Sequence, residues 1–445
     1  MNNIKVNKRT GGKTSLRKDI LRLTVPNVIS NITVPLIGMA DMAIAGHAGG
    51  DCAIGGVTIG TTVFNMIYWN CAFLRMGGSG VTAQNFGAGK LEECALTGLR
   101  SLLLGMALSI ALLLLKPVVT EAALSVIGGT PGTLSEASVY VNIRYWAIPA
   151  SVSLFALTGW FIGMQAPHTP MLIALASNAI NIAASWALAL HEGMGVAGVA
   201  WGTVIAQYSG LTMAVTVAIV KYGNMRRKLT VCRLFQKAEF ARLLSVNRDI
   251  FLRTLCLVVV FTSFTSISAR YGASVLAANA LMMQFFTLFS YMTDGLAYAA
   301  ESLCGKLIGA GDRASLKNAI RELTLAGLMT AVLYTIAFAT SWRAIFNAFG
   351  PSADAVGLAA GRIGWAIAVP LSSFFAFIAD GVMIGATNGH AMRNTMAIAS
   401  LTFFAIYFTL RPLVDDNALW AAFICYMVMR GLLLLPHVRR LVTNK

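Results

Sequence analysis

Apolar segments long enough to cross a lipid bilayer recur along the whole 445-residue chain, and they constrain the fold more than any other feature. A helix needs about 20 mainly apolar residues to cross the hydrocarbon core. Reading the apolar runs between glycine, proline and charged clusters gives twelve such segments. They cover approximately 20–47, 55–87, 98–128, 138–165, 169–191, 196–221, 247–271, 276–307, 317–349, 355–386, 393–413 and 417–438. The sequence therefore predicts an all-α polytopic membrane protein with twelve transmembrane helices.

The composition agrees with this prediction and excludes two other classes of protein. Mean hydropathy is +0.70 and only 12% of the residues are charged, which is too few to cover the surface of a soluble protein of this size. A transmembrane β-barrel would show segments of about ten residues in which apolar and polar residues alternate, and the sequence has none. The first apolar run is also longer than the roughly 7–15 residues of a signal-peptide core, so we expect a retained first helix.

The distribution of basic residues predicts the orientation in the membrane. With both termini in the cytoplasm, 25 of the 34 lysines and arginines fall on the cytoplasmic side and four on the external side. Such a bias is the positive-inside signal of an inner-membrane protein. The net charge of +16 then reflects topology and attraction to anionic lipid, so we expect no nucleic-acid partner.

The two halves of the chain resemble each other weakly. The matching pairs are NFGAGK (85–90) with LIGAGD (307–312), RYWAIP (144–149) with RIGWAIAVP (362–370), GMQAPH (163–168) with GATNGH (385–390), and VAW (199–201) with ALW (418–420). The offset between the members of a pair is nearly constant, and each half holds six spans in the same order. Two six-helix lobes related by a pseudo-two-fold axis along the membrane normal, with a V-shaped central cavity, are typical of transporters.

The repeat also predicts the domain boundaries. We expect an N-lobe over 1–221 that begins with a basic cytoplasmic segment, 1–19. A cytoplasmic linker covers 222–246, and a C-lobe covers 247–445.

The acidic residues within the predicted spans include Asp41, Asp294, Glu301 and Asp380. A carboxylate at the bilayer centre costs roughly 2.5–3.5 kcal/mol on insertion scales, so it usually faces a polar cavity, pairs with a base or takes up a proton. These residues are therefore candidates for cation coupling or substrate binding. A structural ion pair is the alternative interpretation.

Asp41 is the main candidate for coupling. It shares one helix face with Asn27, and Pro35 between them cannot donate to the Asn31 carbonyl, which predicts a hinge in the first span. Arg75 lies near the cytoplasmic end of the next span, too far in depth to pair easily with Asp41. Without a permanent basic partner, a buried carboxylate is suited to binding and releasing a proton.

Polar residues on three other spans complete the predicted site. Asn178, Asn181 and Ser185 share one face of the fifth span, where they line a pocket with Asp41 or only join helices by hydrogen bonds. In the C-lobe, Tyr291, Asp294, Tyr298 and Glu301 form one stripe, and Asp380 has Phe377 one turn before it. Carboxylates beside aromatic and methionine side chains suit lipophilic cations. Arg75 is expected to pair with Asp294 across the lobes in one conformation.

The two lobes carry different acids. By the repeat, Asp380 corresponds to Thr158 and Asp41 to Phe264, which predicts different roles for the lobes. The seven cysteines are scattered singly and the five histidines lack ligand spacing, so we expect no disulfide framework, metal centre or cofactor.

Several motifs resemble the DinF branch of the MATE (multidrug and toxic compound extrusion) transporters. They are FLRMGGSGVTAQNFGAG (73–89), DIFLRTLC (249–256), LAANALMMQFFTLFSYMTDGLAYAAESLCGKLIGAG (276–311) and ADGVMIGATNGHAMRNTM (379–396). The resemblance implies a two-lobed, twelve-helix, V-shaped exporter that exchanges drug-like compounds for H⁺ or Na⁺. It also implies that the family's first-helix and tenth-helix aspartates fall on Asp41 and Asp380.

The chain departs from the family pattern in the fifth helix. The family's asparagine falls on Asn181, but its aspartate four residues later is replaced by Ser185. A hard cation such as Na⁺ prefers several charged oxygens, so a single carboxylate favours proton exchange.

We therefore expect a monomeric, cation-coupled antiporter of the inner membrane, H⁺-driven rather than Na⁺-driven, that exports a lipophilic small molecule. Two alternatives stay open. A flippase of lipid-linked precursors would need a cavity rich in basic residues, whereas the candidate residues are mostly acidic or polar. An intramembrane enzyme would need a nucleophile–base pair or metal ligands, and the sequence has no HExxH motif, so we expect no enzyme.

Overall fold

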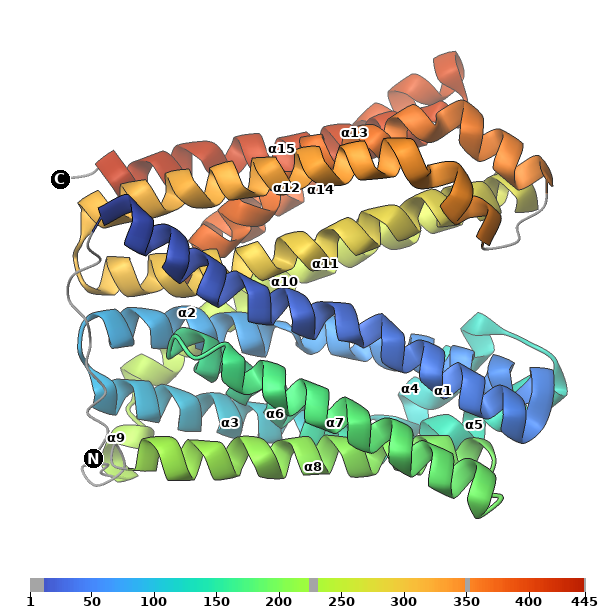
Figure 1. The fold of residues 1–445 in the computed structure, drawn as a ribbon, viewed down its shortest axis with the longest axis horizontal. Helices are drawn as coiled ribbons and strands as arrows, with labels where there is room; N and C mark the ends of the chain where they lie inside the picture. The colour runs from blue at the N-terminus through green and yellow to red at the C-terminus, as the bar shows by residue number, and fades with distance from the viewer. Residues whose placement is uncertain (1–11, 224–230, 349–352, 444–445) are drawn as a thin grey trace. The chain divides into compact units, whose positions relative to one another are not determined.

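The computed structural model describes residues 12–223, 231–348 and 353–443 (Figure 1). All elements in these ranges are helical. In chain order they are α1 (Gly12–Cys71), α2 (Phe73–Gly87), α3 (Leu91–Leu114), α4 (Lys116–Ile127), α5 (Pro131–Arg144), η1 (Tyr145–Ala147), α6 (Ile148–Gly163), α7 (His168–Trp186), η2 (Ala187–His191), α8 (Val196–Tyr222), α9 (Val231–Leu234), α10 (Lys237–Arg270), α11 (Ala273–Gly309), α12 (Arg313–Ala348), α13 (Ala353–Gly385), α14 (Gly389–Val414) and α15 (Asn417–Thr443).

Eleven helical stretches in the described residues are long and apolar enough to cross a membrane. The first stretch, Ser15–Gly87, covers two predicted spans. Its helices are divided at Gly49 and Gly50, whose dihedral angles are not helical, and Gly50 has a φ of 65° that glycine adopts without strain. The prediction of an all-helical polytopic membrane protein is confirmed. The predicted end of one span, residue 349, lies outside the described residues.

The third predicted span, 98–128, is two helices in the structure. α3 ends at Leu114 and α4 begins at Lys116, with Pro117 in its first turn. Proline lacks the N–H that would continue the α3 ladder but is well tolerated at a helix start. The single span expected there is therefore corrected to a broken helix.

The described chain forms two compact units. The N-unit is Ile29–Leu244, and the C-unit is Met1–Val28 with Ser245–Lys445. The predicted N-lobe held the whole first helix, whereas the part of α1 up to Val28 groups with the C-unit. Arg17 pairs there with Glu322 at 2.7 Å. Residues 1–11 of the predicted basic segment and 224–230 of the predicted linker lie outside the described residues, and the V-shaped cavity stays a prediction.

Each unit contains the same close helix crossing, which is the repeat in three dimensions. In the N-unit, a Cβ on Gly159 of α6 would lie 2.1 Å from the carbonyl oxygen of Arg75 on α2. In the C-unit, a Cβ on Gly381 of α13 would lie 2.3 Å from the carbonyl oxygen of Ala297 on α11. Gly381 follows Gly159 along the chain by the same number of residues as Ala297 follows Arg75. Small residues let helix backbones approach closely in membranes, so these glycines set the α2–α6 and α11–α13 packing.

Replacing Gly381 by alanine should destabilise the C-unit, because the new methyl group would overlap backbone atoms of α11 that cannot move aside. Overpacking of this kind costs about 1–3 kcal/mol, which should lower the thermal unfolding midpoint in detergent by several degrees. Gly361→Ala is the matched control, since a Cβ at this position of α13 meets no atom within 4 Å. Equal midpoints for the two variants would contradict the role given to the crossing.

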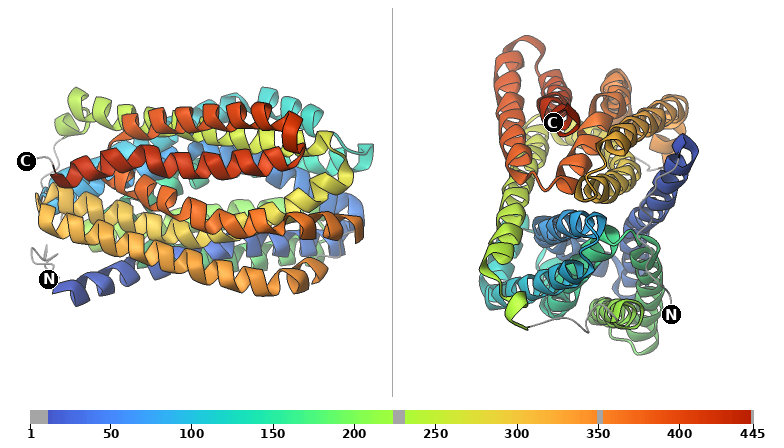
Figure 2. Two further views of the ribbon diagram at one scale, coloured as in Figure 1. Left: turned by 90° about the horizontal axis from the view of Figure 1, so that it is seen from above. Right: turned by 90° about the vertical axis from the view of Figure 1, so that its left-hand side faces the viewer.

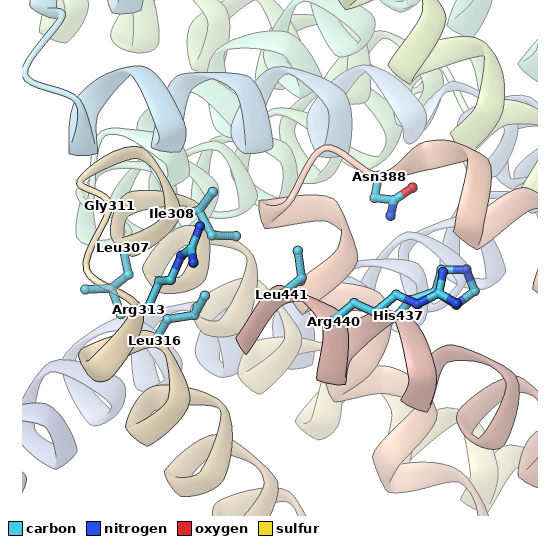
Figure 3. A pocket seen from close by; sticks show the side chains of 9 residues that line it. All are labelled: Leu307, Ile308, Gly311, Arg313, Leu316, Asn388, His437, Arg440 and Leu441. Carbon is cyan, nitrogen blue, oxygen red and sulfur yellow. The ribbon is translucent and has the colours of Figure 1, made fainter. Parts of the chain in front are cut away.

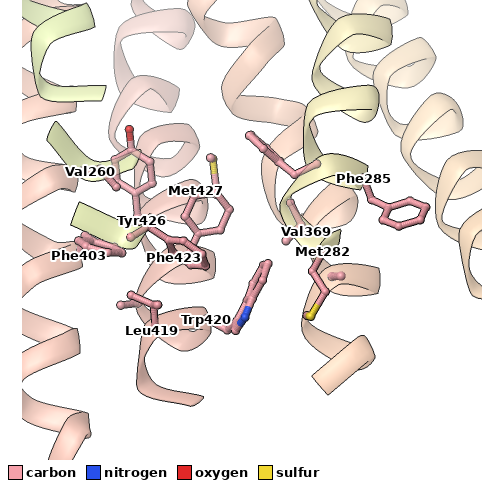
Figure 4. Packing of buried hydrophobic residues seen from close by; sticks show 14 of the residues in the cluster. Val260, Met282, Phe285, Val369, Phe403, Leu419, Trp420, Phe423, Tyr426 and Met427 are labelled. Carbon is pink, nitrogen blue, oxygen red and sulfur yellow. The ribbon is translucent and has the colours of Figure 1, made fainter. Parts of the chain in front are cut away.

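The core of the C-unit is aromatic (Figure 4). Trp420 and Phe423 of α15 pack edge-on against Phe264 of α10, with ring centroids 5.1 and 5.4 Å apart. The indole N–H of Trp420 donates to Asn279 Oδ1 at 2.9 Å, which satisfies the one polar group of this buried side chain. Two further views show α14 and α15 side by side (Figure 2).

Part of the predicted linker, the short helix α9, is held against α3. Arg100 is almost fully buried and donates to the carbonyl oxygens of Arg233 (2.6 Å) and Leu234 (3.0 Å) in α9. Arg233 in turn pairs with Glu92 and Glu93 at 2.7 and 3.0 Å. These contacts fix α9 within the N-unit.

Candidate functional site

Asp41 lies on α1 within the N-unit and is 5% exposed. Its Oδ1 is buried without a hydrogen-bond partner in the part of the chain that the structure describes. Asp41 forms no salt bridge within the described residues, but the charge of Arg144, on α5, acts on it. Asp41 was predicted to lack a permanent basic partner; a guanidinium is near it but is not bonded to the carboxylate.

Arg144 is held by other groups. Its Nη1 donates to the Tyr140 hydroxyl at 2.5 Å and to Thr61 Oγ1 at 3.3 Å. The guanidinium carbon lies 4.9 Å from the ring centroid of Phe64, close enough for a cation–π interaction. Gly60 makes room for the ring of Tyr140, because a Cβ there would lie 2.2 Å from it. The second half of α1 and α5 thus place the positive charge near Asp41 and leave Nε of Arg144 without a partner among the described atoms.

Polar contacts extend from this cluster to α6 and α8. Tyr68, whose hydroxyl also interacts electrostatically with Arg144, donates to Ser151 Oγ at 3.2 Å. Ser151 donates to Gln207 Oε1 at 3.1 Å. A connected set of hydroxyl and amide groups therefore runs between helices beside the charged pair.

The repeat shows what is unusual about Arg144. Its counterpart is Arg362, which forms an ion pair with Asp416 in the C-unit. When VAW and ALW are aligned at the last helix of each half, Asp416 corresponds to Ala197. Arg144 thus lacks the carboxylate that holds its counterpart, and Asp41 is the acid whose charge reaches it.

The predicted polar face of α7 is used for helix packing. Ser185 is fully buried and donates to the Val199 carbonyl oxygen at 3.4 Å, and a Cβ on Gly202 would lie 2.2 Å from its hydroxyl oxygen. Asn181 donates to Thr203 Oγ1 at 3.1 Å, while its Oδ1 is buried without a hydrogen-bond partner among the described residues. Asn178 is half-buried. A shared pocket of these residues with Asp41 stays a prediction.

Asn27 and Pro35 lie on α1 on either side of the division between the units. The Asn27 amide donates to the Leu23 carbonyl oxygen one turn earlier at 2.7 Å. At Pro35 the helix continues, and within described α1 only Gly49 and Gly50 have non-helical dihedral angles. Bending at Pro35 stays a prediction.

Asp380 of α13 sits in a buried ion cluster. Its Oδ2 accepts hydrogen bonds from Arg253 of α10 and from Arg430 of α15, the latter at 2.8 Å. Asp380, Arg253 and Arg430 are only 6%, 8% and 3% exposed. Arg430 also lies 5.6 Å from the ring centroids of Phe377 and Tyr426. Arg253 and Arg430, which were not among the predicted site residues, therefore share this aspartate.

The remaining predicted residues of the C-unit lie on α11. The charge of Asp294 acts on Arg430 and on Tyr291, and Glu301 is fully buried. Tyr298 is half-buried one turn before Glu301. Arg75, on α2 of the N-unit, is buried, and its pairing with Asp294 across the lobes stays a prediction.

A further buried acid was not predicted. Asp249, at 1% exposed, accepts from Arg393 Nη1 at 2.9 Å and lies 3.1 Å from His390 Nδ1. These residues join α10 to the start of α14. No group of three or more histidine, cysteine or acidic residues able to hold a metal ion occurs in the described residues.

Comparisons with known proteins agree with this architecture. The family model MatE matches residues 26–187 and 250–409, one segment in each half of the chain. DNA damage-inducible protein F of Escherichia coli (strain K12) is 33% identical over 429 residues, which are 96% of this chain and 93% of that protein. A probable multidrug resistance protein NorM of Bradyrhizobium diazoefficiens is 24% identical over 408 residues, covering 88% of this chain and 84% of that protein.

Solved structures show the same fold. The outward-facing conformation of a multidrug resistance MATE family transporter of the MOP superfamily matches with a TM-score of 0.86 at 17% identity, over 100% of this chain and 99% of that chain. A MATE structure in the bent conformation matches with a TM-score of 0.85 at 17% identity, over 97% and 99% of the two chains. The chain therefore belongs to the MatE family, the MATE transporters, as a multi-pass membrane protein of the DinF branch.

Proposed function

We propose that this transporter is a cation-coupled secondary antiporter that exports lipophilic, often cationic, compounds across the inner membrane, with H⁺ as the favoured coupling ion. One observation carries the proposal: Asp41 is a buried carboxylate with an unpartnered oxygen and no salt bridge among the described residues. Its charge can change without breaking a fixed ion pair. The chain acts as a monomer with both termini in the cytoplasm, without cofactor, enzymatic activity or nucleic-acid partner.

The role of Asp41 follows from its distance from water and its nearness to Arg144. When Asp41 is ionised, it attracts the Arg144 guanidinium, which the Tyr140 hydroxyl and Thr61 hold in place. Protonation removes this attraction, so α1 is released to move relative to α5, bending at Pro35. The proton and the substrate then favour different arrangements of the N-unit. Each shifts the equilibrium between these arrangements only as far as it binds one more tightly than the other.

Proton coupling is favoured over Na⁺ coupling by the groups around Asp41. Na⁺ prefers several oxygen ligands with negative charge. Ser185, at the position where the family has a second carboxylate, has its hydroxyl engaged with the Val199 carbonyl. The positive charge of Arg144 also opposes a second cation beside Asp41.

Substrate recognition in the C-unit is proposed to involve Asp294, Asp380, Tyr291, Tyr298 and Glu301. Within this set, Asp380 serves mainly as the counter-ion of Arg253 and Arg430. Relatives named multidrug resistance protein and DETOXIFICATION protein support a drug-like substrate.

The proposal predicts the driving force that proteoliposomes will require. Uptake of a lipophilic cation such as ethidium should rise several-fold over protein-free vesicles when the vesicle interior is acidic, because outward proton flow is exchanged for inward substrate flow. An outward Na⁺ gradient at equal pH should leave uptake at the level of protein-free vesicles. Uptake that follows the Na⁺ gradient and ignores the pH gradient would overturn the choice of H⁺.

The arginine pair at Asp380 favours a second candidate, a flippase of a lipid-linked precursor, because anionic head groups need basic partners. A fluorescent phospholipid pyrophosphate in the same vesicles separates the two functions. Its translocation without ethidium transport would replace the antiporter proposal.

A further inference from the structure

A cavity of about 460 Å³ opens at one end of the C-unit (Figure 3). Its apolar wall includes Leu307, Leu316 and Leu441. Its polar groups include Arg313, His437 and Arg440. Figure 3 shows Arg313 beside Ile308 on one side and Arg440 with His437 on the other. The cavity therefore combines apolar surface with basic side chains and has no acidic residue in its described lining.

The cavity lies where helices leave the membrane. It is formed at the turn between α11, which ends at Gly309, and α12, which begins at Arg313, and by the last turns of α15, which ends at Thr443. All three helices are candidate membrane spans. Their ends mark the boundary between hydrocarbon and water, where the phosphate groups of lipids are found.

The basic groups can be reached from the outer side of the cavity. Arg440 and Arg313 are exposed, and His437 is half-buried. His437 Nδ1 donates to the Leu433 carbonyl oxygen at 3.3 Å, so Nε2 is the ring nitrogen left for a ligand. Asp312, the acid next to Arg313 in the chain, accepts from the Ser315 N–H at 2.9 Å as the cap of α12.

The repeat indicates that most of these polar groups are not a general consequence of the positive-inside bias, whereas Arg440 corresponds to Lys221 and is basic in both halves. The alignment of the repeat motifs matches Arg313 with Leu91, and Asn388, another lining residue, with Ala166. In the last helix of each half, His437 corresponds to Ala218. At three positions, the cavity has a polar residue where the first half of the chain has an apolar one.

We infer that this cavity binds an anionic phospholipid, with the phosphate between Arg313 and Arg440 and an acyl chain along the leucine wall. Basic pockets between transmembrane helices bind acidic head groups in this way. Charge complementarity selects an anionic over a zwitterionic head group, and the apolar wall selects a lipid over free phosphate. This assignment is independent of the transported substrate.

Native mass spectrometry of the delipidated full-length protein tests the assignment. Phosphatidylglycerol should remain bound to the wild type at least tenfold more than phosphatidylcholine. The double variant Arg313→Gln/Arg440→Gln should bind phosphatidylglycerol about tenfold or more weakly, since each basic residue near a lipid surface contributes about a factor of five. Lys317→Gln/Arg439→Gln is the matched control, because both side chains are exposed at the same end of the C-unit and the change in charge is the same.

The outcomes separate specific binding from its rivals. Retention of phosphatidylglycerol by the control and its loss from the cavity variant would support the lipid site. Equal losses from both variants would reduce the effect to general surface charge and overturn it. Displacement of phosphatidylglycerol by millimolar inorganic phosphate would assign the cavity to a soluble anion instead and would also overturn it.

Discussion

Asp41→Asn is expected to reduce pH-driven substrate uptake in proteoliposomes to the level of protein-free vesicles. Asparagine has nearly the same shape as aspartate but cannot exchange a proton at any accessible pH, so transport loses its coupling. Asp41 forms no salt bridge within the described residues, and Arg144 keeps its hydrogen bonds to Tyr140 and Thr61. The fold should therefore survive, with a thermal unfolding midpoint within a few degrees of the wild type.

Asp51→Asn is the matched control for this experiment. Asp51 lies in α1 directly after the break at Gly49 and Gly50, undergoes the same chemical change and has an exposed side chain. It should transport at the wild-type rate, and Asp41→Glu should retain part of the pH-driven rate because it keeps a titratable group. Wild-type uptake by Asp41→Asn under the pH gradient would exclude Asp41 as the coupling group.

Much of the fold could be predicted from the sequence because span length and charge bias are local properties. Runs of about 20 apolar residues must become helices in hydrocarbon, where backbone groups have no water to bond. The crossing at Gly159 and Gly381 was not predicted, although these two glycines are separated by the repeat offset. The prediction misses the break between α3 and α4 because the hydropathy stays high across it, and Pro117 was the signal that could have marked it.

The candidate site could be predicted only in part. Asp41 and Asp380 stand out because an acid in an apolar run is rare, but their partners come from distant helices. Arg144 follows Asp41 by about a hundred positions, and Arg253 precedes Asp380 by 127, so no local spacing connects them. Helix packing decides which charges meet. The matched arginines of RYWAIP and RIGWAIAVP were a usable signal, since one half has a carboxylate, Asp416, just before its last helix and the other half has alanine at the aligned position.

Asp380 and Asp41 differ in the basic side chains that surround them. Asp380 has two guanidinium groups bonded to one oxygen, whereas Asp41 has one guanidinium near it and none bonded among the described residues. Asp380 is thus part of a fixed ion cluster. This difference is the reason why the proposed coupling is placed at Asp41, in the N-unit.

Asp380→Asn is accordingly expected to destabilise the protein strongly. The substitution leaves Arg253 and Arg430 buried without their shared counter-ion, and breaking a buried ion pair by removing one partner costs about 3–5 kcal/mol. The thermal unfolding midpoint in detergent should fall by about 10 °C or more. Asp415→Asn is the control, because Asp415 is exposed and has a φ of 48°, which asparagine adopts readily.

A double substitution distinguishes charge imbalance from a local packing defect. Arg430→Gln in the Asp380→Asn background removes one of the two uncompensated positive charges. It also removes the electrostatic interaction between Asp294 and Arg430. If imbalance is the cause, the double variant should unfold at a higher temperature than Asp380→Asn alone, so the two effects are strongly non-additive. If the two decreases in midpoint simply add, the residues are not coupled, and Asp380 would have to be considered again as a free acid open to protons or substrate.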